Sequence, residues 1–372
     1  MELSSLNPEQ RQAVRTVDGP LLILAGAGTG KTRVITSRVA YMISRGIRPR
    51  NILAVTFTNK AAREMKERVK SLVPKRRLVG EDGQTEKPTI CTFHSLCVRI
   101  LRRHITKLGY KKNFVIYDAT EQLGVVRRIL SQISLGSKKP DPYAVLSLIS
   151  RWRNSNSDEL IAEDQDLAAL AKRLVATYQQ TLKASNAVDF DDLILLVLRL
   201  FAECPEALDE CRERYRYIMV DEYQDTNNSQ FELVHSLARE HRNFCVVGDD
   251  DQSIYGWRGA EVANLLDLEK HFPEVKVVKL EQNYRSTNTI LEAANAVIKN
   301  NIQRREKKLW SNKGAGEPIT LWEFRDDEEE AQALVEEINF NRSIKKVKWR
   351  EQAILFRTNQ QSRPLETALR KA

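Results

Sequence analysis

The sequence predicts a doubly wound α/β fold, in which helices cover both faces of a parallel sheet. Short apolar runs alternate along the chain with amphipathic helical stretches. Most of these runs are continuously apolar, as expected for parallel strands that are buried on both faces. A glycine-rich turn follows the first run directly. This order of strand, turn and helix is typical of βαβ units.

The apolar runs define the expected strands. They occupy residues 21–24, 52–57, 89–93, 217–220, 244–247, 275–280 and 353–356. Residues 32–44 are predicted as a helix, because Ile35, Val39, Met42 and Ile43 fall on one helical face.

The chain of 372 residues is long enough for two or three domains. Residues 1–107 and 186–279 are predicted to form the first α/β domain. Residues 108–185 are helix-rich and lack a buried-strand signature, which indicates a helical insertion domain. Residues 280–372 are predicted to begin a second α/β lobe. Its few strands would leave an open sheet edge, so we expect a fragment of a longer protein.

The composition favours a polyanionic partner. The formal charge is +9 and the pI is about 9.2, although a solvated basic surface would explain both values equally well. Basic clusters lie at residues 75–77, 99–104, 111–112 and 304–308. They could line one groove only if the fold gathers them.

The five cysteines are odd in number and none has CxxC spacing, so we expect reduced cysteines, mostly in the core, and no zinc site. No apolar run is as long as a membrane span, and the first residues lack a signal-peptide core. The expected location is the cytoplasm, with association to the nucleoid if the source is bacterial, or another compartment that contains DNA.

The strongest motif lies between the first strand and the first long helix. It reads Ala25-Gly26-Ala27-Gly28-Thr29-Gly30-Lys31-Thr32. Glycines let backbone N–H groups surround phosphate oxygens, and the following helix adds a partial positive charge. Lys31 would reach the β- and γ-phosphates, and the Thr32 hydroxyl would bind Mg²⁺. Ala25 stands where the general pattern has glycine.

Two carboxylates follow a later strand, at residues Asp221 and Glu222. The carboxyl ends of parallel strands are where α/β sheets place ligands. Asp221 would hold Mg²⁺, and Glu222 would orient and deprotonate a water molecule. The alternative is a nucleotide switch that rarely hydrolyses its ligand, but such a switch does not need a second carboxylate here.

Further motifs give the sequence a specific resemblance. Asp221-Glu222-Tyr223-Gln224-Asp225 is similar to the acidic signature of helicases, and it is followed by residues 247–260 (VGDDDQSIYGWRGA) and 282–286 (QNYRS). Residues 6–10, 56–62, 92–95, 189–192 and 356–359 complete the set. In this order the motifs resemble those of UvrD/Rep/PcrA-type superfamily 1A DNA helicases over essentially the whole chain.

The resemblance implies a RecA-like P-loop NTPase domain with a helical insertion domain and a partial second RecA-like lobe. It also implies translocation on single-stranded DNA from 3′ to 5′ and unwinding at single/double-strand junctions, with ATP and Mg²⁺ as cofactors. The implied catalytic residues are Lys31, Glu222, Gln252 and Arg285. The implied nucleotide-binding residues are Gln10, Ala25, Gly26, Ala27, Gly28, Thr29, Gly30, Lys31, Thr32, Arg33, Tyr284 and Arg285.

Each of these residues has an implied task. Gln10 would hydrogen-bond the adenine edge, and Tyr284 would stack on the adenine face. Arg285 would meet the γ-phosphate as an arginine finger. Gln252 would sense the γ-phosphate and relay its state to the DNA side.

The implied DNA-binding residues are Phe57, Asn59, His94, Phe190, Tyr255, Trp257 and Arg258. Aromatic faces stack on bases of any sequence. Phe57 and Phe190 adjoin apolar runs and could instead be core residues, and a lone His94 could be structural. Trp257 lies in a Gly-Trp-Arg-Gly loop, where packing explains a large aromatic side chain less easily.

Two other functions stay open: the helicase half of a recombination helicase–nuclease, and an ATP-dependent module that binds single-stranded DNA without moving. Stacking does not separate DNA from RNA, and the residues indicate no protein partner. We expect the 372 residues by themselves to lack unwinding activity, because the later family motifs are absent from them.

Overall fold

The computed structural model describes residues 3–79, 83–133, 140–154 and 164–372. The chain divides into two compact units, Met1–Ala315 and Gly316–Ala372. Each unit is described by itself.

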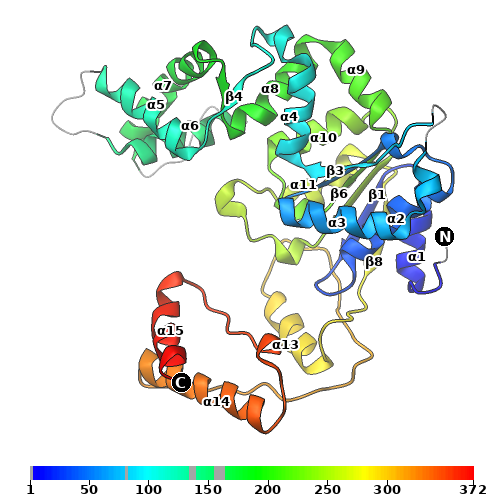
Figure 1. The fold of residues 1–372 in the computed structure, drawn as a ribbon, viewed down its shortest axis with the longest axis vertical. Coiled ribbons are helices and arrows are strands. Elements are labelled where there is room, and N and C mark those ends of the chain that lie inside the picture. Colours follow the sequence, from blue (N-terminus) through cyan, green and yellow to red (C-terminus); the bar gives the residue numbers. More distant parts are fainter. Residues whose placement is uncertain (1–2, 80–82, 134–139, 155–163) are drawn as a thin grey trace. The chain divides into compact units, whose positions relative to one another are not determined.

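The first unit is built on a six-stranded parallel sheet, with strand order β3-β2-β6-β7-β1-β8 (Figure 1). Its strands are β1 (Leu21–Ala25), β2 (Ile52–Thr56), β3 (Thr89–Thr92), β6 (Tyr217–Val220), β7 (Phe244–Gly248) and β8 (Lys276–Leu280). Six of the predicted strands are therefore confirmed, with ends that differ from the predicted ones by at most one residue. The α/β class is confirmed with them.

Apolar side chains cover both faces of this sheet, as continuous apolar runs require. In β1, Leu22 and Leu24 face one buried cluster, while Leu21 and Ile23 face another. The first cluster packs against α4 (Phe93–His104), α8 (Phe190–Glu203), α9 (Pro205–Arg214) and α10 (Asn228–Ala238). The second packs against α1 (Pro8–Arg15), α2 (Lys31–Ser44) and α3 (Asn59–Leu72). Burial of each large aliphatic side chain contributes about 1.5–3 kcal/mol to folding.

A helical region interrupts the sheet between α4 and α8. It contains α5 (Ala119–Ser131), α6 (Pro142–Asn154) and α7 (Gln165–Ala184), which share a separate apolar core around Val145 and Tyr178. A short parallel pair, β4 (Val115–Ile116) with β5 (Ala187–Val188), joins the two chain crossings at its base.

Three further α-helices lie in the described part of the first unit, two of four residues and one of eleven. They are α11 (Ala263–Leu266), α12 (Leu268–His271) and α13 (Asn288–Ile298). After α13 the chain returns to the sheet, where Trp310 forms an isolated bridge with Gln282.

The second unit contains α14 (Asp327–Ser343) and α15 (Ser362–Lys371). The predicted strand at residues 353–356 is wrong: no strand forms among residues 316–372, all of which the structure describes. Leu355 in this run is 93% exposed. A strand needs a neighbour for its backbone hydrogen bonds, and these residues provide none.

Candidate functional site

The glycine-rich turn has the backbone that a phosphate-binding loop requires. It starts where β1 ends at Ala25, and α2 begins at Lys31. Gly28 and Gly30 have φ angles of +70° and +91°, which favour glycine. A Cβ atom at Gly28 would lie 2.6 Å from Nδ2 of Asn283, so the turn also has no room for a side chain there. The first N–H groups of α2 are thereby directed toward the turn.

Lys31 meets the acidic end of β6. Its Nζ lies 3.1 Å from Oε2 of Glu222, and its side chain is mostly buried. Glu222 adopts a left-handed backbone with φ +53°, which costs a non-glycine residue about 1–2 kcal/mol. Its N–H donates to Oδ1 of Asp221 at 3.1 Å. Strained residues of this kind concentrate at functional sites.

Negative charge exceeds positive charge around this pair. Burial, followed by repulsion from Glu222, raises the pKa of Asp221 to about 7, although Lys31 acts in the opposite direction. The same two causes raise the pKa of Asp225 to about 6. Among the described residues, Oδ1 of Asp225 is buried without a hydrogen-bond partner. Together with the Thr32 hydroxyl, these hard oxygen donors fit a divalent cation.

Gln224 connects this acidic end to the next strand. Its Nε2 donates to Oε2 of Glu222 at 3.1 Å, and its Oε1 accepts from the N–H of Asp249 at 3.0 Å. Asp249 directly follows β7, and its carboxylate accepts a hydrogen bond from Nε2 of Gln252. Continuous polar contacts therefore run from Lys31 to Gln252.

Residues 282–285 lie against the glycine-rich turn. Nδ2 of Asn283 donates to the carbonyl of Ala27 at 2.6 Å, and the N–H of Tyr284 donates to the carbonyl of Gly28 at 3.0 Å. The Tyr284 ring is exposed, as is Arg285. The site thus has a partly open aromatic face and a guanidinium beside the turn.

Gln10 is buried, and its side-chain amide forms hydrogen bonds within the protein. Its Nε2 donates to the carbonyl of Thr29 at 2.8 Å, and its Oε1 accepts from the N–H of Asn7 at 3.2 Å. Asn7 also donates to the hydroxyl of Tyr284 at 3.0 Å. The guanidinium of Arg33 donates a hydrogen bond to the carbonyl of Ser5 at 3.0 Å.

Two exposed aromatic side chains follow Gln252 in the chain. Trp257 is 75% exposed and Tyr255 is 40% exposed, and their ring centroids lie 6.5 Å apart. Arg258 lies beside them in sequence, but its side chain is outside the described part of the structure. A loop with this arrangement presents flat apolar faces to solvent, which suits stacking on bases.

A second group of ring side chains, Phe57, His94 and Phe190, lies just after β2, β3 and β5 in the chain. Phe190, the first residue of α8, is half-exposed, and its ring meets that of His94 with centroids 5.6 Å apart. Phe57 is half-buried and packs edge-on against Phe93. Its ring therefore contributes in part to the apolar core, which was the alternative to a role in DNA binding. Asn59 is exposed at the start of α3. Burial lowers the pKa of His94 below 6.5, with Asp191 opposing the shift.

The sequence alone did not indicate the roles of several side chains that organise this site. Asn283 and Gln224 were inside recognised motifs, but their contacts needed the fold. The basic cluster 304–308 was considered for a nucleic-acid groove. Instead, Arg304, Arg305 and Lys307 are directed toward acidic groups of the protein.

Known protein families match both parts of the chain. Residues 6–273 match the UvrD/REP helicase N-terminal domain, and residues 278–372 match the UvrD-like helicase C-terminal domain. No helix in the described ranges has the length and apolarity to cross a membrane.

Curated relatives agree with these family matches. A protein named ATP-dependent DNA helicase PcrA from Staphylococcus aureus is 47% identical over 375 residues, covering 100% of this chain and 50% of the relative. The protein of the same name from Staphylococcus epidermidis is 47% identical over 378 residues, with the same coverage. The chain spans about half the length of these relatives. By both the family matches and this identity, the chain belongs to the UvrD/REP helicase family.

Proposed function

We propose that these residues are the ATP-binding part of an ATP-dependent DNA helicase that acts on single-stranded DNA and at single/double-strand junctions. The observation that carries the proposal is the polar path from Lys31 through Glu222, Gln224 and Asp249 to Gln252, next to the exposed Trp257. It provides a physical link between a phosphate site and a base-stacking loop. Family membership and the names of the relatives support the same activity.

At the nucleotide, Lys31 and the N–H groups of residues 25–32 bind the phosphates. Tyr284 stacks on adenine, while Gln10 orders the turn through Thr29 and accepts an adenine hydrogen bond when its contacts rearrange. Thr32 and Asp221 would hold Mg²⁺, and the ion would supply positive charge to neutralise the phosphates. Release of Lys31 from Glu222 to the phosphates leaves that carboxylate able to orient and deprotonate the attacking water. Arg285 and Gln252 stabilise charge on the γ-phosphate.

On the DNA side, Phe57, Phe190, Tyr255 and Trp257 stack on bases, and Asn59, His94 and Arg258 contact the strand beside them. In domain terms, residues 1–107 and 186–279 form the first RecA-like domain, and residues 108–185 form its insertion. Residues 280–372 begin the second lobe. We further propose movement from 3′ to 5′, in a bacterial cytoplasm at the nucleoid.

The test is steady-state ATP hydrolysis by the full-length protein with and without single-stranded DNA. A motor requires strong stimulation by DNA. A strand-displacement assay on a duplex with a 3′ tail then tests unwinding, and a 5′-tailed duplex is the control for direction. If DNA binds but does not stimulate ATP hydrolysis, the result would instead support the alternative function, a module that binds single-stranded DNA without moving along it.

A further inference from the structure

Three adjacent carboxylates lie at the end of β7. Oxygens of Asp249, Asp250 and Asp251 all lie within 4.8 Å of one another. Such a group is unfavourable unless a positive charge lies among them, because like charges at this separation repel strongly in a poorly solvated place.

Lys307 supplies that charge. Its Nζ lies 2.9 Å from Asp249, 2.6 Å from Asp250 and 2.6 Å from Asp251, and its side chain is only 3% exposed. Burial alone lowers the pKa of Lys307, but the three carboxylates outweigh it and the pKa is raised. The ammonium therefore occupies the position that a metal ion would need.

Neighbouring residues attach the same segment to the acidic group. Arg304 donates to both oxygens of Asp251, at 3.0 and 2.9 Å. The N–H of Arg305 donates to Oδ2 of Asp250 at 2.7 Å. We call residues 304–310 the basic strap.

The other end of the basic strap touches the nucleotide site. A Cβ atom at Gly26 would lie 2.4 Å from Cδ2 of Leu309, so Leu309 packs directly on the glycine-rich turn. The carbonyl of Trp310 accepts from the N–H of Asn283 at 2.8 Å, and Asn283 in turn holds Ala27. One short segment thus contacts both the phosphate-binding turn and the residues that hold Gln252.

Asp249 is the point where these contacts meet. Its carboxylate binds Lys307 and the side chain of Gln252, and its N–H is held by Gln224. Without the ammonium, the three carboxylates would move apart. Asp249 would then no longer hold the start of the loop that carries Gln252 and Trp257 in one position.

We propose that Lys307 is a positioning residue that couples the nucleotide site to the DNA-stacking loop by holding Asp249 and, through it, Gln252. The inference rests on the proposed function, because it concerns how that function links its two ligands. It predicts that loss of the Lys307 charge uncouples ATP hydrolysis from DNA binding, while the protein still binds nucleotide and DNA.

The experiment compares Lys307→Met with Lys308→Met in the full-length protein. Lys308 is the adjacent residue, its side chain is exposed, and its loss removes the same charge. Fluorescent ADP measures nucleotide affinity. A labelled oligo-dT measures DNA affinity with and without a non-hydrolysable ATP analogue, and ATP hydrolysis is measured over a range of oligo-dT concentrations.

For Lys307→Met we expect nearly unchanged affinity for ADP, and for oligo-dT without nucleotide. The stimulation of hydrolysis by DNA should fall roughly tenfold or more, within the usual range of coupling between sites, and the analogue should no longer change DNA affinity. Lys307→Arg should recover part of the coupling, and Lys308→Met should behave as wild type.

Wild-type stimulation in a folded Lys307→Met protein would overturn the inference. If wild type itself lacks stimulation, the proposed function fails instead. If Lys307→Met does not fold, Lys307→Met combined with Asp250→Asn removes one charge of each sign. A folded but uncoupled double variant supports the inference, whereas a coupled one, or failure of both to fold, overturns it in favour of a purely structural ion pair.

Discussion

Lys31 and Glu222 form a direct ion pair, with Nζ 3.1 Å from Oε2, in the site proposed to bind ATP. The side chain proposed to hold phosphate is thus paired with the carboxylate proposed to activate water. Phosphate binding and activation of the carboxylate are therefore linked, because Lys31 must leave Glu222 to reach the γ-phosphate.

This pair predicts different effects for two substitutions. Glu222→Gln should bind ATP at least as tightly as wild type, because Lys31 is released, but turnover should fall about 10²–10⁴-fold with the general base removed. Lys31→Ala should lose both affinity and turnover. Fluorescent-nucleotide titration and steady-state hydrolysis measure the two quantities. Equal loss of ATP affinity in both variants would show that the role given to Glu222 is wrong.

The glycine-rich turn offers a matched pair of substitutions. Gly28 and Gly46 both have positive φ, +70° and +92°, but only Gly28 has a neighbour that a Cβ atom would strike. Gly28→Ala should displace Asn283 and weaken nucleotide binding roughly tenfold or more, whereas Gly46→Ala should cost only about 1 kcal/mol of stability. Nucleotide titration and urea unfolding distinguish the two effects. Equal nucleotide affinity in the two variants would contradict the close approach.

Trp257→Ala should weaken binding to single-stranded DNA by about 1–3 kcal/mol, the usual effect of losing one stacking face. The dependence of affinity on salt should not change, because no phosphate contact is lost. Fluorescence anisotropy over a range of salt concentrations measures both. Trp349→Ala is the control, since Trp349 is also exposed but lies in the second unit. Unchanged affinity in a folded Trp257→Ala protein would remove this residue from the DNA site.

Arg153, on α6, is buried against two carboxylates at the N-terminal end of α8. Its Nη1 lies 2.7 Å from Asp189, its Nη2 contacts Asp192, and these acids cap the helix that begins with Phe190. Arg153→Met should destabilise the fold by about 3–5 kcal/mol, because a buried pair loses one partner, and should weaken DNA binding through Phe190.

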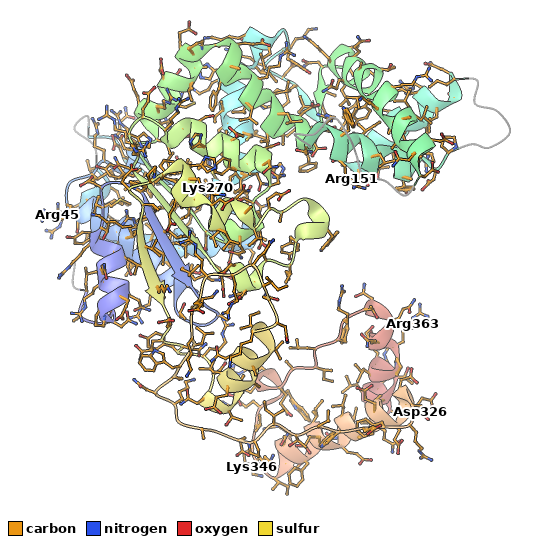
Figure 2. All side chains as sticks on the ribbon, turned by 180° about the vertical axis from the view of Figure 1, so that it is seen from behind. Arg45, Arg151, Lys270, Asp326, Lys346 and Arg363 are labelled. Atoms are coloured by element: carbon orange, nitrogen blue, oxygen red, sulfur yellow. The ribbon has the colours of Figure 1, made fainter. Side chains whose placement is uncertain are left out.

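Urea unfolding and oligo-dT binding test this prediction. Arg151→Met is the matched control, because Arg151 is exposed on the same helix and is labelled on the helical region in Figure 2. If the two variants unfold alike, the buried pair does not stabilise the junction.

His94 gives a prediction for pH. Burial lowers its pKa below 6.5 in the folded protein, so the unfolded chain takes up this proton more readily. The contribution of His94 to stability should therefore decline as pH falls below 6.5. Between about pH 7.5 and 5.5, His94→Gln should lose less stability than wild type in urea unfolding. Parallel pH dependence of the two proteins would show that His94 titrates normally.

Local sequence patterns determined much of this protein. Six strands, the glycine-rich turn and the acidic pair after β6 were predicted, because each depends on residues that are adjacent in the chain. Continuous apolar runs require two covered faces, and a turn with positive φ requires glycine, whatever the rest of the chain does.

Only the tertiary structure decided which distant groups meet. Lys307 resembled part of a DNA-binding basic cluster until the fold placed it among three carboxylates that lie more than fifty residues earlier. The apolar run 353–356 resembled a strand, but no segment in the described part of the chain pairs with it. Strand pairing and buried charge neutralisation are interactions between two segments, so their free energy depends on a neighbour that a local pattern cannot identify.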